Sequence, residues 1–247
     1  MKLNHYQQIA DCLYPPFKPS DGISLEEIER VERAKKFTLP KVLRDFYLLV
    51  GNHEAINYSF NRLIGIENIE IEKRKLVFYN ENQGVCNWAI DKNDLKQEDP
   101  PVWQGQWIHQ PNEIDWYSEQ DDPLVWQPQW INFHKDKIEW HLETSRLSVF
   151  LTSMICWQSV MGGLPFCAGS GKVEDLNVKK IESNFEEVDF GEDYKEFRAF
   201  IDEGKVLCVS AGEHENSLNI AASNKNKLLE IIQFLSIQWN YNSLDDE

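Results

Sequence analysis

The apolar residues of this sequence follow a helical period as far as about residue 50, and they alternate from about residue 60 onward. Helices are expected over residues 4–13, after the capping pair Ser24 and Glu27, from Pro40 to Gly51, from 145 to Gly162, and over 225–239. Strands are expected over residues 76–79, 85–90, 137–142, 178–189, 205–210 and 217–222. This order of helices, strands, helix, strands and helix predicts an α+β fold rather than alternating parallel units.

The composition indicates a folded, water-soluble chain. Apolar residues make up 42% of the 247 residues, and nine Trp and thirteen Phe can fill a core, so global disorder is excluded. At roughly 100–200 residues per domain, the length fits one large domain or two small ones. The uncharged stretch 147–171 is interrupted by polar residues, and its helical part is only ~22 Å long at 1.5 Å per residue, against the ~30 Å of a bilayer. We therefore expect a buried core helix there.

The cysteines and the N-terminus indicate a cytoplasmic protein. The five cysteines are odd in number and widely spaced, and no C-x-x-C pair occurs that would suit a zinc ribbon or a thioredoxin-type site. The first residues, MKLNHYQQIADCLYPP, lack the continuous apolar run of a secretory signal. Free thiols without a signal suit a reducing compartment.

The octet Glu81–Trp88, ENQGVCNW, gathers a carboxylate, amides, a thiol and an indole, as an active site would. A nucleophilic Cys86 requires a nearby base, usually histidine, and all six histidines are distant in sequence. Cys86 also alternates with Asn87 in an apolar strand, where cysteine is usually a small apolar filler. We therefore favour a structural role for the octet.

Two further candidate sites lack a complete pattern. Glu139, His141 and Glu143 share one strand face and could hold a metal, but an exposed polar face explains the same alternation and is favoured. Residues 169–172 resemble a phosphate loop, which would need glycine at Phe166 and a hydroxyl at Val173. We expect no metal, no cofactor and no enzymatic activity.

The charge is uneven along the chain. The net charge is −16, which argues against binding nucleic acid or anionic membrane and favours a basic partner. Residues 91–122 hold nine acids against two bases, and residues 182–203 hold nine acids against two bases, a net charge of −7 each. The partner-binding residues predicted from these windows are Asp91, Asp94, Glu98, Asp99, Asp115, Glu119, Asp121, Asp122, Glu186, Glu187, Asp189, Glu192 and Asp193.

One segment is duplicated. Residues 99–108, DPPVWQGQWI, match residues 122–131, DPLVWQPQWI, at eight of ten positions. Two copies are too few for a solenoid, so we expect two similar extended segments whose aromatic side chains pack on the sheet. A weaker alternative is a stacking platform of four tryptophans, for which the adjoining basic groove of a single-strand binder is missing from the sequence.

Several of these motifs, in this order, resemble the SUKH superfamily, which includes fungal cell-wall assembly regulators and many bacterial immunity proteins. The similar segments are SLEEIE at 24–29, Leu39-Pro40, DFYLLVG at 45–51, LVFYNENQGVCNW at 76–88 and DPPVW at 99–103. The family-signature residues, to which the resemblance assigns structural roles, are Glu81, Asn82, Gln83, Gly84, Trp88, Pro100, Pro101 and Trp103.

The resemblance implies a single SUKH-like domain over residues 1–247 with a curved, mostly antiparallel or mixed sheet and flanking helices. Residues 20–165 carry the resemblance, and residues 176–240 continue the same unit. It implies a cytoplasmic immunity protein that neutralises a cognate basic polymorphic toxin, such as a nuclease, by stoichiometric binding, with monomers favoured. The alternative is a regulatory scaffold or small-ligand-binding module of the cell-wall assembly regulator type.

Overall fold

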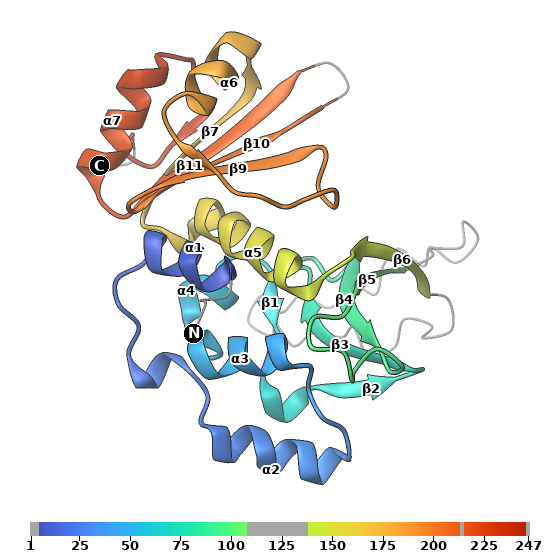
Figure 1. The fold of residues 1–247 in the computed structure, drawn as a ribbon. Coiled ribbons are helices and arrows are strands. Elements are labelled where there is room, and N and C mark those ends of the chain that lie inside the picture. The colour runs from blue at the N-terminus through green and yellow to red at the C-terminus, as the bar shows by residue number, and fades with distance from the viewer. Residues whose placement is uncertain (1–4, 108–137, 213–214, 246–247) are drawn as a thin grey trace, which may run out of the picture.

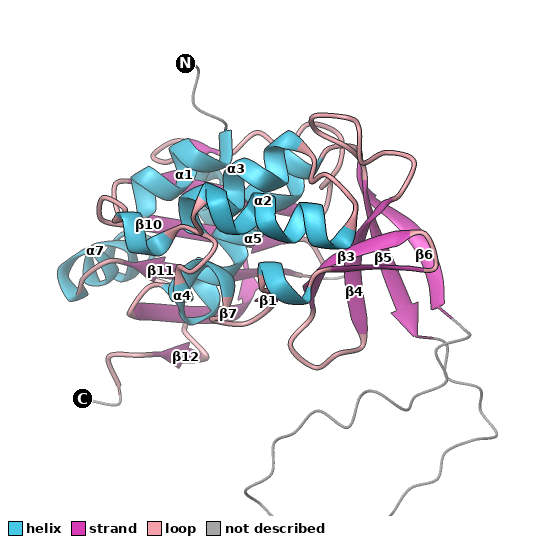
Figure 2. Cartoon of the chain, turned by 90° about the horizontal axis from the view of Figure 1, so that it is seen from below, coloured by secondary structure: helices cyan, strands magenta, loops and turns pink. Residues whose placement is uncertain are grey.

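The structure, a computed structural model, describes residues 5–107, 138–212 and 215–245. Two six-stranded antiparallel sheets lie on either side of helix α5, Leu147–Gln158 (Figure 1). Figure 2 shows the same division from another direction, with β3–β6 at one end of the molecule and β7, β10 and β11 at the other. These helices and sheets confirm the predicted α+β class.

The first half of the chain forms four helices and one sheet. The helices are α1 (His5–Leu13), α2 (Leu25–Lys35), α3 (Lys41–Val50) and α4 (Glu54–Asn57). The strands are β1 (Arg62–Leu63), β2 (Glu70–Glu72), β3 (Lys75–Asn80), β4 (Cys86–Asp91), β5 (Val102–Trp107) and β6 (Ile138–Thr144). Their order is β1-β3-β4-β5-β6, and β2 also pairs with β3. The Ser24 hydroxyl accepts a hydrogen bond from the Glu27 amide at the start of α2, which confirms the predicted N-cap.

The second half forms the other sheet and two helices that pack on it. The elements are β7 (Phe166–Val173), α6 (Asp175–Glu182), β8 (Glu186–Glu187), β9 (Phe197–Asp202), β10 (Lys205–Ser210), β11 (Asn216–Ala222), α7 (Lys225–Leu235) and β12 (Tyr241–Asn242). The strand order is β12-β7-β11-β10-β9-β8. The described strands thus form two sheets, where the resemblance implies one.

Helix α5 is the centre of the molecule because its side chains are apolar on nearly every side. Ten of its twelve residues are buried, as expected for a helix that lacks a polar stripe. A π-helical turn, Ser159–Gly163, extends it, and Gly162 at φ 104° allows the chain to leave the helix. Among the described helices, none combines the length and the apolar character that crossing a bilayer requires.

Two apolar clusters hold the elements together. The larger cluster joins α1, α3 and α5 with residues of both sheets, for example Trp88 on β4 and Cys208 on β10. The smaller cluster lies between the second sheet and helices α6 and α7, and includes Ile181 and Leu228. Because the larger cluster is continuous across both halves, it supports our proposal that residues 1–247 form one domain.

Some sequence-based predictions for the second half are wrong. Residues 178–189 alternate loosely and predict strands, but residues 175–182 form α6, with Val178 and Ile181 on its buried side. Only two residues of that range, in β8, are extended. Strands β7 and β9 were not predicted, and α7 ends at Leu235 instead of Trp239 because Ser236 adopts a left-handed cap at φ 52°.

The buried Gln158 amide fastens α5 to the first sheet. Its Oε1 accepts hydrogen bonds from the backbone amides of Phe60 (2.8 Å) and Asn61 (3.0 Å). Its Nε2 donates to the Asn61 carbonyl (2.6 Å) and to the Tyr79 hydroxyl (3.1 Å). Asn61, Tyr79 and Gln158 are buried and Phe60 is partly buried, so the single side chain satisfies several polar atoms that water reaches poorly.

Replacing Gln158 with leucine should therefore destabilise the protein strongly. The change leaves two amides and a carbonyl without partners, at about 1–3 kcal/mol for each buried group. We expect the free energy of unfolding to fall by roughly 3 kcal/mol or more, measured by chemical denaturation. Gln233→Leu, at an exposed position of α7, is the matched control; equal stability of the two variants would contradict this role.

Candidate partner-binding surface

The signature octet forms the turn between β3 and β4. The Glu81 carboxylate accepts hydrogen bonds from the amides of Gln83 (2.8 Å) and Val85 (3.3 Å), and so holds the turn from inside. Gly84 has φ 73°, a left-handed conformation that side-chain-bearing residues avoid. The Asn82 amide donates to the Asn61 side chain (3.3 Å), which links the turn to the segment that Gln158 binds.

The other signature residues pack or bind within the fold. Trp88 is 5% exposed, and its ring contacts those of Tyr79 and Phe150, with centroids 6.0 and 5.5 Å away. Trp103 lies on the other face of the sheet, where the Lys75 ammonium sits 4.2 Å from its ring centroid. Pro100 is buried and Pro101 half-buried in the connection before β5.

The start of α5 is bound by acidic residues from both sequence windows. The Asp99 carboxylate accepts hydrogen bonds from the amide (2.7 Å) and hydroxyl (2.6 Å) of Ser148, and the Pro100 carbonyl accepts from the Leu147 amide (2.8 Å). The Asp193 carboxylate binds the amide (2.8 Å) and hydroxyl (2.9 Å) of Ser145 in the same way. Negative charge is favourable at a helix N-terminus, where the first amides also need acceptors.

Ser145 and Ser148 are functional positions that the sequence patterns alone did not reveal. Both serines flank the first residue of the apolar run that becomes α5, and this position was the available signal. Their partners lie about fifty residues away on either side, at Asp99 and Asp193. The fold thus brings together two acidic windows that are separate in the sequence.

Most predicted partner-binding residues that the structure describes already have partners within the chain. Asp91 is 3.3 Å from the Lys75 ammonium and accepts the Asn93 amide, and these contacts lower its pKa against the opposing effect of burial. Asp94 accepts a hydrogen bond from the Gln97 side chain, and Asp189 accepts one from the Gly191 amide. These carboxylates shape loops.

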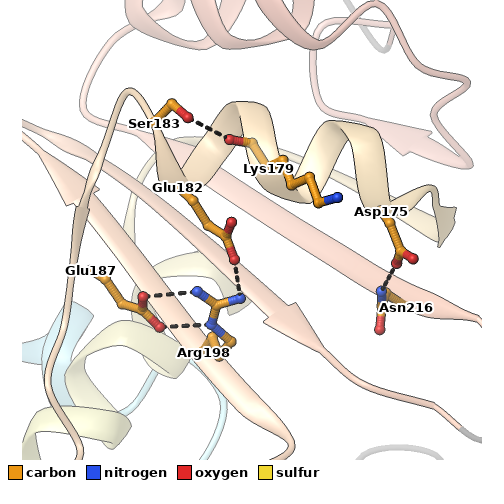
Figure 3. A network of polar contacts seen from close by, with 7 residues as sticks. All are labelled: Asp175, Lys179, Glu182, Ser183, Glu187, Arg198 and Asn216. Carbon is orange, nitrogen blue, oxygen red and sulfur yellow. Dashed lines mark hydrogen bonds and ion pairs between the residues drawn. The ribbon is translucent and has the colours of Figure 1, made fainter.

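In the second window, Arg198 binds two glutamates. Its guanidinium donates to both carboxylate oxygens of Glu187 (2.6 and 2.8 Å) and to Glu182 (2.6 Å), as Figure 3 shows. Glu192 is almost fully exposed and 3.7 Å from Lys195, while Glu186 and Glu98 are exposed without a side-chain partner among the described residues. The remaining predicted residues, Asp115, Glu119, Asp121 and Asp122, lie outside the described residues.

A comparison of the sequence with models of known protein families finds one match. The model of the SMI1/KNR4 family (SUKH-1) matches residues 22–137, which span α2 to β5 and include the signature turn. This region of the chain belongs to the SUKH superfamily. Searches among curated proteins and among solved structures found no match. For this SUKH protein, membership supports a protein-binding role of the toxin-immunity or SMI1/KNR4-like kind.

The chemistry around Cys86 in the SUKH protein differs from that of an activated thiol. Cys86 is 8% exposed, and burial raises its pKa to about 11, with Glu81 and Glu143 adding to the effect. Such a thiol stays protonated at neutral pH, whereas a nucleophilic cysteine needs a lowered pKa. SUKH proteins are generally non-enzymatic, in keeping with this environment.

Glu143 on β6 does not join Glu139 and His141 in a common site, although the three residues alternate along the strand. His141 and Glu139 are exposed and 3.9 Å apart, whereas Glu143 is half-buried and accepts a hydrogen bond from the Tyr194 hydroxyl (3.0 Å). Burial raises the pKa of Glu143, while the hydrogen bond from Tyr194 opposes that shift. Within the described residues, no group of three His, Cys, Asp or Glu side chains is arranged to hold a metal.

Glu143 should make the SUKH protein less stable as pH rises. The pKa of Glu143 is higher in the folded state than in the unfolded state, so the folded state binds the proton more tightly. The resulting contribution to the free energy of unfolding is lost as pH rises through the folded pKa. Glu143→Gln should thus raise the midpoint of thermal unfolding at pH 7, with a difference that shrinks below about pH 4.5. A Glu143→Gln variant whose midpoint follows that of the parent chain at every pH would refute the assignment.

Asp99 should stabilise α5 by capping it. Asp99→Ala removes both acceptors from Ser148, and losing a cap costs about 1 kcal/mol, with a range of roughly 0.5–2 kcal/mol. Differential scanning calorimetry should show a midpoint lower by about 2–4 °C for each kcal/mol. Glu98→Ala, at the exposed neighbouring position, should change it little; a larger loss for Glu98→Ala would contradict the capping role.

Proposed function

We propose that this SUKH protein is an intracellular immunity protein that binds a basic toxin domain one-to-one and covers its active site. The proposal rests on the family membership together with the arrangement of acidic residues around the start of α5. The proposed target is the cognate toxin of a polymorphic toxin system, such as a nuclease, whose own substrate would demand a basic surface. The proposed compartment is the cytoplasm, where the five free thiols are stable.

The observation that carries the proposal is the meeting of the two acidic windows. The carboxylates of Asp99 and Asp193 offset the partial positive charge at the N-terminus of α5. The exposed carboxylates next to them therefore keep their full negative potential toward solvent. Those neighbours are Glu98, Glu192 and Glu196, all exposed. Such a surface would attract a cationic partner and speed its association, over a range of ~8 Å at physiological salt.

The nature of the surface favours binding over catalysis. Glu98, Glu192 and Glu196 stand on loops beside regular elements, and the buried Cys86 thiol is protonated at neutral pH. An immunity protein needs complementarity of shape and charge to its target, not a reacting group. Asp121 and Asp122, in the same window as Asp99, extend the proposed acidic surface on sequence grounds.

A regulatory scaffold of the SMI1/KNR4 kind is the second candidate, because the matching family model carries that description. The two candidates differ in their partner. An immunity protein pairs with a toxin domain encoded beside its own gene and rescues growth when that domain is expressed. A regulator leaves the toxin active and binds other proteins.

Charge reversal should locate the contact surface. Glu192→Lys with Glu196→Lys removes two exposed carboxylates and adds two repulsive charges, so we expect Kd for the neighbouring-gene toxin domain to rise about tenfold or more at low salt. Asp121→Lys with Asp122→Lys tests the other window. Isothermal titration calorimetry at several salt concentrations measures both Kd and its salt dependence.

Glu26→Lys, exposed on α2 and outside both windows, is the matched control for charge reversal. It should leave Kd within about twofold of the parent value, since exposed charges beyond a Debye length are screened. Binding that is unaffected by both window variants would exclude the acidic surface. A toxin domain that neither co-purifies with the chain nor is neutralised by it would exclude the immunity role itself.

A further inference from the structure

One hollow of the described surface is a groove with the opposite charge to the chain as a whole. It has a volume of about 830 Å³ and is lined by residues of the α2–α3 connection, β2 and the segment after β4. One glutamate, Glu98, and five lysines line it, namely Lys35, Lys36, Lys41, Lys92 and Lys96. A groove with this excess of positive charge, in a chain of net charge −16, calls for an anionic occupant.

Three of these lysines are available to a partner. Lys36, Lys92 and Lys96 are exposed and have no ion-pair partner in the part of the chain that the structure describes. Lys41 pairs with Asp45 and Lys35 lies 3.6 Å from Glu70, so those two positive charges are partly compensated within the fold. Lys92 and Lys96 are the two bases of the first acidic window, and the fold turns this part of the window into a basic surface.

The floor of the groove is apolar and rigid. Leu39 is buried there, and Phe37, Ile71 and Leu95 are half-buried. The buried Glu32 carboxylate fixes the α2–α3 connection, since it accepts the Leu39 amide (2.8 Å) and pairs with Arg44. The Val42 amide binds the Glu98 carbonyl (3.0 Å) and joins two walls of the groove. The site is therefore formed before any partner arrives.

Backbone strain is concentrated at the same place. Four described non-glycine residues have positive φ, and three of them are basic and lie on or beside the groove: Lys36 at 58°, Lys73 at 43° and Arg74 at 73°. Lys36 occupies a helix C-cap position where glycine is usual. Lys73 and Arg74 form the β2–β3 turn, whose two positive φ angles favour Asn-Gly, and the Arg74 carbonyl accepts the Lys92 amide (2.8 Å).

The positive φ angles point to a functional role for these basic residues, because glycine or asparagine would adopt the same backbone conformation at a lower cost. A non-glycine residue in a left-handed conformation costs of order 1 kcal/mol, and such costs cluster at functional sites. Asparagine or glycine would relieve the turn but would remove its positive charge. Lys36 is itself one of the groove lysines, and Lys73 and Arg74 place two more basic residues beside the groove, although the Arg74 guanidinium also lies 3.8 Å from Asp91.

We propose that this lysine groove is a second docking surface, which binds an acidic peptide segment carrying an apolar side chain from a partner protein. The carboxylates would pair with Lys36, Lys92 and Lys96, while the apolar side chain would rest on Phe37 and Leu95. The volume lies within the roughly 300–1,000 Å³ typical of ligand sites. This surface has the opposite sign to the acidic surface proposed for a basic toxin and borders it at Glu98, and the two proposals rest on different residues otherwise.

A peptide suits the groove better than a nucleic acid does. A polyanion extends well past the groove and would be repelled by the remaining charge of a chain at −16, whereas a short acidic segment stays within a Debye length of the lysines, ~8 Å. The groove is also a hollow with an apolar floor rather than an extended basic stripe. Nucleic-acid binding is therefore an outcome of the test that would overturn the proposal.

Fluorescence anisotropy of the full chain with a labelled peptide of alternating Glu and Phe tests the proposal. We expect saturable binding at low salt that weakens as salt is added, and no binding of the same peptide with Gln in place of Glu. Lys92→Glu with Lys96→Glu should weaken binding at least tenfold, because two attractive pairs become repulsive. Lys179→Glu with Lys180→Glu, exposed on α6, is the matched control and should change Kd less than about twofold.

A second variant separates the binding role from folding. Lys73→Asn with Arg74→Gly gives the turn its preferred residues, so we expect a higher midpoint of thermal unfolding together with peptide binding weakened several-fold. Loss of affinity in a more stable protein cannot arise from misfolding. Absence of peptide binding by the parent chain, equal binding by the Lys92/Lys96 variant, or tighter binding of single-stranded DNA than of peptide would overturn the proposal.

The groove could also be occupied by a second copy of this acidic chain, and the same variants address that outcome. Sedimentation at several protein concentrations would reveal a dimer, and its dissociation by Lys92→Glu with Lys96→Glu would assign the groove to self-association. That result would overturn the partner-peptide proposal. A monomer throughout, with the peptide affinities given above, would support it. The immunity proposal is tested separately by the toxin domain and survives either result.

Discussion

The structure depends on satisfying the polar groups of α5, an apolar helix buried between two sheets. Unpaired buried amides cost about 1–3 kcal/mol each, so such a helix needs partners at both ends. At its start, Asp99 and Pro100 come from the connection into the first sheet, and Asp193 comes from the second half of the chain. Near its end, Gln158 binds the segment at 60–61 and Tyr79. The same few hydrogen bonds therefore fix the helix and tie both halves to it.

This arrangement also explains how the charges are distributed. Acidic residues used inside the fold, such as Asp99 and Asp193, offset the positive end of α5, and their exposed neighbours remain for a partner. The lysines of the first window face another way and join those of the α2–α3 connection. A net charge of −16 thus conceals two surfaces of opposite sign, each suited to a different kind of partner.

Sequence patterns predicted the elements whose signals are local. The Ser24 cap, the helix after Pro40 and the β3–β4 hairpin depend on neighbours in the chain, and the structure contains all three. Strand β7 was not predicted because Gly169 and Gly171 lack strand propensity, and pairing with β11 and β12 imposes its extended form. In α6, burial of Val178 and Ile181 against the second sheet overrides a loose alternation. The candidate site was predictable only in part: the acids were visible, but Ser145 and Ser148 were not.

The sequence by itself determined the α+β class, the buried central helix, the signature turn and the family, because periodicity, capping residues and short motifs act over a few neighbouring positions. Only the tertiary structure decided which charges are available. Glu187 and Glu192 look alike in the sequence, yet Arg198 binds one with both carboxylate oxygens and leaves the other in solvent. Lys92 likewise belongs to an acidic window in the chain and to a basic groove in space. Charges interact through distance and burial, and folding sets both by bringing together residues that are far apart in the sequence.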